Sequence, residues 1–221
     1  MRINNFEKFT FNNSEIRGIK LLVNFSLKNN VEIILHEETQ DKYQQLKSID
    51  VVKSFPPLLF SVDIDSADIN SLNIPKEVNT LTLLDGHHRL EHLSLYKYDH
   101  PVPVVLIANQ DVSVESYNSE INTDEDEFVD TLLQNNYNNL ISSEYCITFQ
   151  NTTYVNEDVK SIYDLYDFKR KLIKQEIITP VQNDSVDAST NIVDFTPIKL
   201  EEFYKEKYLF PPKSTWISPR I

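Results

Sequence analysis

The chain of 221 residues is 40% hydrophobic and 25% charged, which is typical of a globular protein with one large or two small domains. Its formal net charge of −13 argues against nucleic acid or an anionic membrane as a partner. The single cysteine, Cys146, excludes an internal disulfide and is typical of a reducing cytoplasm. Since the sequence has no apolar run of transmembrane length and no signal-peptide core, the expected location is cytoplasmic.

The first half of the chain predicts a strand-rich unit. Apolar runs predict strands, in chain order, over 19–27, 31–35, 58–62, 80–85 and 101–108. Apolar residues at helical spacing predict helices over 38–53 and 87–98. The order strand, turn, helix, strand over 80–108 therefore predicts a compact α/β unit.

The second half predicts helices over 125–134 and 158–176, with a hairpin between them. The hairpin spans 144–155 and is expected to turn at Asn151. One side of the longer helix carries Ile162, Leu165, Tyr166, Lys169 and Leu172. The remaining expected features are a polar mobile loop over 181–190, a strand over 191–195, a helix from Pro197 and a proline-containing, non-helical segment over 210–221.

Residues 82–90 read TLLDGHHRL and place one of two glycines beside two of five histidines. A strand that ends at Leu84, a positive-φ turn at Gly86 and a helix that begins near His87 would leave free backbone N–H groups at the helix start. Together with Arg89, these groups would form an anion site. The pattern by itself fits a plain surface turn equally well, because Asp-Gly is a common turn dipeptide.

A metal site is another interpretation of these histidines. His88 and His92 are four residues apart on the predicted helix, a spacing that can chelate a transition metal. Residues 36–38 (HEE) begin like a zincin motif, but Gln40 stands where its second histidine would be. A metal-dependent hydrolase would use His36, His88 and His92, and it ranks third among the interpretations.

Three separated motifs carry a resemblance to a known superfamily. LLDGHHRLEHL followed by PVPVV resembles the Asp-Gly-x-His-Arg signature of the ParB/sulfiredoxin superfamily, in which this turn binds nucleotide phosphates. The double histidine is closer to the free-serine kinase branch, which contains the archaeal ADP-dependent serine kinase and related bacterial proteins. That branch also has an element similar to residues 35–37 (LHE) and a segment similar to residues 210–216 (FPPKSTW).

Departures from the motif exclude two neighbouring activities. His87 occupies the position where sulfiredoxin has its catalytic cysteine, and Cys146 lies far away in the sequence, so peroxiredoxin repair is not expected. ParB proteins follow their nucleotide domain with a DNA-reading helix-turn-helix in a basic context, and neither feature is found here. The kinase branch fits the sequence best.

The resemblance implies an α/β fold (mixed α+β): a ParB/sulfiredoxin-like nucleotide-binding core with a mixed sheet, and a smaller α/β C-terminal part. The core would span residues 1–110 and the C-terminal part residues 111–221. The last segment of the C-terminal part, 210–217, would return to the active site. Its apolar anchors Phe210, Trp216 and Ile217 argue against the alternative of a disordered tail.

The activity implied is phosphoryl transfer from an adenine nucleotide, ATP or ADP, with Mg²⁺, to free L-serine or a similar small hydroxyl compound, giving O-phosphoserine. Glu37 would be the general base and Asp85 would organise Mg²⁺ or the acceptor. Without the other motifs, the more common interpretation of Glu37 is an exposed glutamate at the start of a helix. The phosphates would be held by Gly86, His87, His88, Arg89, Lys213 and Ser214. The acceptor would be held by Thr215 and His36.

The acceptor pocket departs from the family pattern. Tyr43 and approximately Ser119 stand where the serine kinase has a second glutamate and a tryptophan, and Glu38 or Glu120 would have to replace the missing carboxylate. The sequence therefore leaves the acceptor and the choice of ATP or ADP open. A non-catalytic nucleotide-binding switch or interaction module of the same fold is the main alternative, and the oligomeric state is open as well.

Overall fold

The computed structural model describes residues 6–11, 17–24, 31–33, 56–71, 81–87, 89–90, 101–139, 143–186, 191–199, 210–211 and 213–221. The chain forms two compact units. Unit 1 consists of Met1–Ser113 together with Ile217–Ile221, and unit 2 consists of Val114–Trp216. Among the described residues, none of the helices has the length and apolar character needed to cross a membrane.

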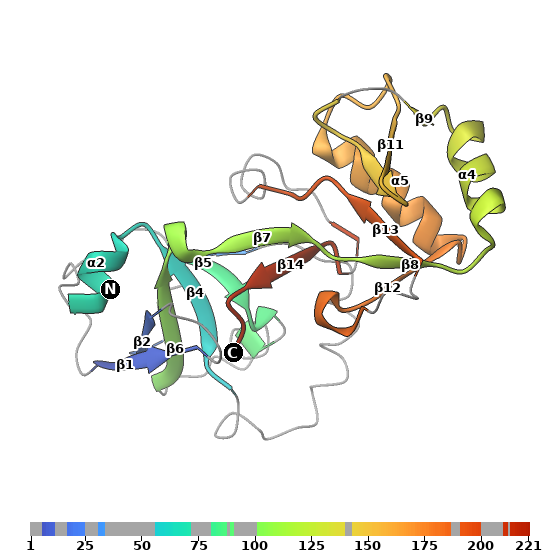
Figure 1. The fold of residues 1–221 in the computed structure, drawn as a ribbon. Helices are drawn as coiled ribbons and strands as arrows, with labels where there is room; N and C mark the ends of the chain where they lie inside the picture. Colours follow the sequence, from blue (N-terminus) through green and yellow to red (C-terminus); the bar gives the residue numbers. More distant parts are fainter. Residues whose placement is uncertain are drawn as a thin grey trace. The chain divides into compact units, whose positions relative to one another are not determined.

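Unit 1 is built on a six-stranded mixed sheet (Figure 1). Its strands, in the order in which they pair, are β1 (Phe6–Thr10), β2 (Arg17–Asn24), β6 (Pro101–Ala108), β4 (Leu58–Val62), β5 (Leu81–Asp85) and β3 (Val31–Ile33). The pairs β4–β6 and β3–β5 are parallel, and the other three pairs are antiparallel. Because β4 runs antiparallel to β5, the start of β4 lies beside the end of β5, with Leu59 opposite Asp85.

The centre of this sheet is the core of unit 1. All five residues of β4 and the first four of β5 are buried. From Val102 to Ala108, β6 is buried except at Pro103. Continuous burial of this kind, rather than alternation, is expected of central strands that are covered on both faces. Two short helices, α2 (Ser66–Ser71) and η3 (Asn109–Asp111), lie in the same unit, and the Ser66 hydroxyl donates to the Asp111 carboxylate at 2.7 Å.

Unit 2 contains a second six-stranded sheet, and this one is antiparallel throughout. Its strands, in pairing order, are β12 (Ile178–Pro180), β8 (Ser119–Ile121), β13 (Ile192–Phe195), β10 (Ile147–Phe149), β11 (Thr152–Val155) and β9 (Asn138–Asn139). The helices are α4 (Glu125–Gln134), α5 (Ile162–Lys174) and the short η4 (Asn183–Ser185). β7 (Ser113–Ser116) and β14 (Thr215–Ser218) pair separately as a two-stranded sheet.

The helix α5 shows how local sequence fixes an element in unit 2. It begins after Ser161, whose hydroxyl accepts from the N–H of Asp164, and its last turn carries Lys171 and Lys174 beside the negative end of the helix dipole. The predicted stripe is confirmed, because the buried residues of α5 are Ile162, Leu165, Tyr166, Lys169 and Leu172. Four of these five are apolar or aromatic, so Lys169 is the exception that needs a reason.

The predicted elements and the structure differ in two places, and a third prediction is not tested. The helix expected from Pro197 is not formed over residues 196–199, and residues 200–209 lie outside the described residues. The loop expected over 181–190 contains η4, which is fixed because the Asn183 amide donates to the Ser116 carbonyl at 3.0 Å; residues 187–190 are not among those described. The helix expected over 38–53 also lies outside the described residues.

Candidate functional site

The predicted turn at Asp85-Gly86 is formed at the carboxyl end of β5. Asp85 is the last residue of the strand, and Gly86 has a φ of 98°. Residue 87 is already helical, and the N–H of Leu90 donates to the Gly86 carbonyl at 2.8 Å. Helix starts of this kind present backbone N–H groups that no helical carbonyl can satisfy. The conformation predicted for this motif is therefore confirmed.

Gly86 is required by two independent features of the turn. Its positive φ is a conformation that residues with a Cβ atom rarely adopt. In addition, a Cβ at this position would lie 2.4 Å from Cδ2 of Leu58 and 3.1 Å from Nε of Arg89. Since Leu58 is 1% exposed at the start of β4, it has no free space into which to move. Packing and backbone conformation both exclude a side chain here.

Arg89 holds the turn together from one helical turn further along the chain. Its Nη2 donates to Oδ2 of Asp85 at 2.9 Å, and its Nη1 donates to the carbonyls of Pro56 and Pro57, the latter at 2.8 Å. The Arg89 side chain is 15% exposed, so these bonds are partly shielded from water. At least three of the five guanidinium N–H groups are thus used inside unit 1. The sequence predicted Arg89 as a phosphate ligand, and the contacts found here show a bracing function for it as well.

Asp85 is a half-exposed carboxylate at the end of β5, and its predicted role in Mg²⁺ binding stays a prediction. Its side chain is 51% exposed, and Arg89 binds Oδ2. Mg²⁺ in phosphoryl-transfer sites is usually bound through one or two carboxylates together with substrate phosphates, so a half-exposed carboxylate beside helix-start N–H groups fits it. Within the described part of the chain, no group of three histidine, cysteine or acidic residues could hold a metal ion by itself.

The second predicted motif, Lys213–Thr215, lies in unit 2 and is an ordered turn. Lys213 has a φ of 51°, and its ammonium lies 5.8 Å from the centroid of the Tyr117 ring. Ser214 is fully buried, and its hydroxyl donates to the Pro211 carbonyl at 2.6 Å. The anchors Phe210, Trp216 and Ile217 are 1%, 8% and 9% exposed, so the segment is not a free tail.

Sequence reasoning missed the residues that support this second turn. The Ser214 carbonyl accepts from the N–H of Tyr117 and from the hydroxyl of Tyr166, both at 3.2 Å. The Tyr117 carbonyl in turn accepts from Nζ of Lys169 at 2.8 Å. Only Lys169 gave a signal in the sequence, as a charged residue within an apolar stripe.

The structure brings some predicted site residues together and leaves the rest as predictions. Asp85, Gly86 and Arg89 lie together in unit 1, whereas Lys213, Ser214 and Thr215 lie together in unit 2. His36, Glu37, His88 and His92 lie outside the described residues, as does Tyr43. A single site that combines both motifs with Glu37 therefore stays a prediction, and so does a histidine metal site.

Solved structures identify the fold, although no family model and no curated protein matches the sequence. A free serine kinase mutant in complex with AMP matches 96% of this chain and 91% of its own, at 14% identity and a TM-score of 0.51. SbnI with a C-terminal truncation, from Staphylococcus aureus, matches 91% and 84% respectively, at 12% identity and a TM-score of 0.57. The chain has the mixed α+β fold of these proteins.

This result confirms the predicted fold class, a mixed α+β architecture with a mixed sheet. A further free serine kinase mutant, in complex with ADP, matches with the same coverage at 14% identity and a TM-score of 0.51. At such low identity the similarity extends to the fold alone. Membership of the ParB/sulfiredoxin superfamily and of its kinase branch, the roles of individual residues and the substrate stay predictions.

Proposed function

We propose that this protein is a cytoplasmic kinase that transfers a phosphoryl group from ATP or ADP to the hydroxyl of free L-serine or a similar small molecule. One observation carries the proposal: the positive-φ turn at Gly86 leads from β5 into a helix start beside the half-exposed Asp85 carboxylate. In an otherwise acidic chain, a turn of this kind is suited to bind an anion, and the adjacent carboxylate is suited to bind Mg²⁺. The fold shared with free serine kinases, whose structures were solved in complex with AMP and ADP, also supports a nucleotide-dependent kinase.

In this proposal the polyphosphate binds at the turn after β5. The N–H groups that follow Gly86, with His87 and His88, hold the phosphate oxygens, and Arg89 adds positive charge while it braces the turn. Asp85 would hold Mg²⁺, which supplies charge neutralisation at the transferred phosphate. Arg89 is in direct ion-pair contact with Asp85, so the two residues act as one unit.

The proposed transfer needs a base for the acceptor hydroxyl, and we assign this role to Glu37. Its carboxylate takes the hydroxyl proton, the hydroxyl oxygen forms a bond to the terminal phosphorus, and the bond from that phosphorus to the bridging oxygen of the nucleotide breaks. The products are a phosphomonoester, such as O-phosphoserine, and a nucleotide with one phosphate fewer. We assign Lys213 to the phosphates, and Thr215 and His36 to the acceptor. The Ser214 hydroxyl already donates to Pro211, so a contact from Ser214 would have to come from its backbone.

The direct test incubates the purified protein with Mg²⁺, serine and either ATP or ADP, and measures O-phosphoserine by mass spectrometry. We expect phosphoserine with one of the two nucleotides and its loss in Glu37→Gln, with nucleotide affinity retained in calorimetry. Glu125→Gln, which changes an exposed glutamate at the start of α4, is the matched control and should retain full activity.

Other outcomes separate the alternatives. If serine is inactive, a panel of hydroxylated metabolites tests the acceptor, and phosphorylation of another member retains the kinase and corrects the substrate. If none is phosphorylated while nucleotide binding is tight and indifferent to Glu37→Gln, the protein is a nucleotide-binding switch. If calorimetry detects no binding of ATP, ADP or AMP, both of these functions are excluded.

A further inference from the structure

The buried lysine of α5 is unusual because of what surrounds it. Lys169 is 0% exposed, and its Nζ lies 4.8 Å from the centroid of the Phe195 ring and 5.5 Å from that of Tyr166. In the described part of the chain no carboxylate forms an ion pair with it. A buried charge without an ion-pair partner is unfavourable, and a leucine or methionine would fill the same position without that penalty. Packing alone therefore does not explain a lysine here.

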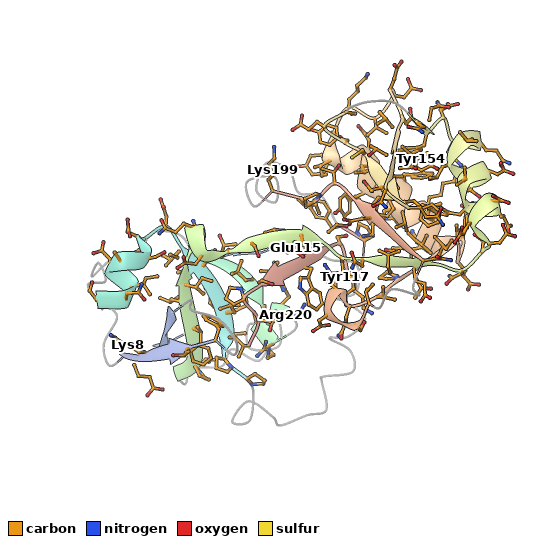
Figure 2. The ribbon with its side chains drawn as sticks, viewed as in Figure 1. Lys8, Glu115, Tyr117, Tyr154, Lys199 and Arg220 are labelled. Carbon is orange, nitrogen blue, oxygen red and sulfur yellow. The ribbon has the colours of Figure 1, made fainter. Side chains whose placement is uncertain are left out.

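The Lys169 side chain is connected through Tyr117 to the turn at Lys213–Thr215. Nζ of Lys169 donates to the Tyr117 carbonyl at 2.8 Å, and the N–H of the same residue, Tyr117, donates to the Ser214 carbonyl at 3.2 Å. The side chain of Tyr117, which is labelled in Figure 2, contacts the same segment. Its ring lies 5.5 Å from the Trp216 ring in an edge-to-face arrangement and 5.8 Å from the Lys213 ammonium.

Tyr166 provides a second link between the lysine and the same carbonyl. Its hydroxyl shares its one hydrogen between the carbonyls of Ser214 and Thr196, each at 3.2 Å, while its ring faces Nζ of Lys169. Burial raises the pKa of this hydroxyl, so it stays protonated and remains a donor. Both residues that donate to the Ser214 carbonyl thus also contact Lys169, Tyr117 through its carbonyl and Tyr166 through its ring, and all of them belong to unit 2.

We propose that Lys169 is a positioning residue that holds the Lys213–Trp216 turn through Tyr117 and Tyr166, and so sets the substrate affinity of the kinase proposed above. The functional half of this inference rests on the proposed function, whereas the structural half does not. Lys169 is fully buried and touches no substrate, so its effect passes through the turn. Removing its Nζ leaves the Tyr117 carbonyl without its side-chain donor and loosens the segment that carries Lys213 and Thr215.

The test uses Lys169→Met, which keeps length and apolar contact but removes the charge. The sequence has one tryptophan, and it is Trp216, so selectively excited fluorescence reports on this turn in the full-length protein. We expect greater quenching by acrylamide and a red-shifted emission, with unchanged far-UV circular dichroism. In the kinase assay we expect KM for the nucleotide or the acceptor, which Lys213 and Thr215 are proposed to bind, to rise about tenfold with little change in kcat. This is the effect of one lost hydrogen bond.

The matched control is Lys174→Met, which removes an exposed lysine from the last turn of the same helix. It should change neither fluorescence nor KM. If Lys169→Met leaves Trp216 quenching unchanged, the inference is overturned, whether or not the protein is a kinase. If quenching rises but wild-type protein phosphorylates nothing, the structural role of Lys169 in holding the turn is supported and the proposed function fails. If quenching rises and KM is unchanged in an active enzyme, the link to substrate affinity is wrong.

Discussion

Gly86 in unit 1 and Lys213 in unit 2 both have positive φ angles, of 98° and 51°, and each belongs to a motif expected to bind phosphate. The first turn is enforced by packing, because the buried Leu58 leaves no space for a side chain at Gly86. The second turn carries a long side chain that is exposed. Its conformation is held instead by hydrogen bonds to the next carbonyl, that of Ser214.

This difference indicates which turn can adapt. A turn fixed by contact with a buried strand start is rigid, and any added atom is opposed by the core of unit 1. A turn held by two hydrogen bonds, from Tyr117 and Tyr166, which are in turn supported by Lys169, can be loosened by the loss of one of these residues. We therefore expect changes at Gly86 to destabilise the whole fold, and changes at the residues that support the Ser214 carbonyl to alter the turn while the fold is retained.

The largest effect is expected for Gly86→Ala. The new Cβ meets Leu58 and the backbone has an unfavourable φ, so we expect the free energy of unfolding to fall by about 3–4 kcal/mol in urea denaturation. The comparison variant is Lys213→Ala, which keeps a Cβ at a positive φ and removes only the contact with the Tyr117 ring. It should lower the free energy of unfolding by about 0.5 kcal/mol. Equal losses in the two variants would contradict the contrast between the turns.

The sequence predicted the elements that carry their own local signal. The runs at 58–62 and 101–108 form β4 and β6, and the hairpin turns at Gln150 and Asn151, both with positive φ. It did not predict β1, whose FEKFT lacks apolar alternation and is a strand because it pairs with β2. It also missed α2, a helix of six residues that Asp65 caps by accepting from the N–H of Ala67.

For the candidate site, the sequence predicted backbone conformation better than contacts. Gly86 was expected at a positive φ before a helix, and it is found there. The partners of Arg89 at Pro56 and Pro57 are more than thirty positions away in the sequence and come into reach only because β4 pairs antiparallel with β5. The Lys169–Tyr117 bond joins residues 52 positions apart, so no local pattern could reveal it.

An effect of intermediate size is expected from pH, because titration of Lys169 changes the free energy of unfolding. Burial lowers the pKa of its ammonium to about 7, and the charge of Asp194 on β13 opposes this shift. Tyr166 on α5 and Tyr117 also face Lys169, and both are uncharged near neutral pH. Because a lysine in the unfolded chain stays protonated up to its ordinary pKa of 10.5, the unfolded chain binds more protons than the folded protein above pH 7. Stability is therefore expected to rise with pH.

The contribution of Lys169 should amount to about 2 kcal/mol of added unfolding free energy between pH 7 and pH 9. Below pH 7 the lysine is protonated in both states, so the penalty of burying the charge is present in full. Denaturation of wild-type protein and Lys169→Met across this pH range isolates the contribution, because the difference between the two curves should grow as pH falls. Parallel curves would show that Lys169 titrates near its ordinary pKa.

The smallest effect is expected for Tyr166→Phe, which tests the second support of the Ser214 carbonyl. Removing the hydroxyl deletes two bonds of 3.2 Å, to Thr196 and Ser214, and should lower the free energy of unfolding by about 1 kcal/mol. Tyr137→Phe is the matched control, since Tyr137 is 1% exposed and its hydroxyl has no hydrogen-bond partner among the described residues.

Tyr137→Phe should be neutral or stabilising, because it relieves a buried polar group of its desolvation. Trp216 quenching distinguishes the two tyrosines more sharply than stability does. It should increase in Tyr166→Phe, by less than in Lys169→Met because the Tyr117 N–H still holds Ser214, and it should not change in Tyr137→Phe. A stability loss in Tyr166→Phe without any change at Trp216 would mean that the hydroxyl serves the Thr196 carbonyl alone, and that Tyr117 is the sole support of the turn.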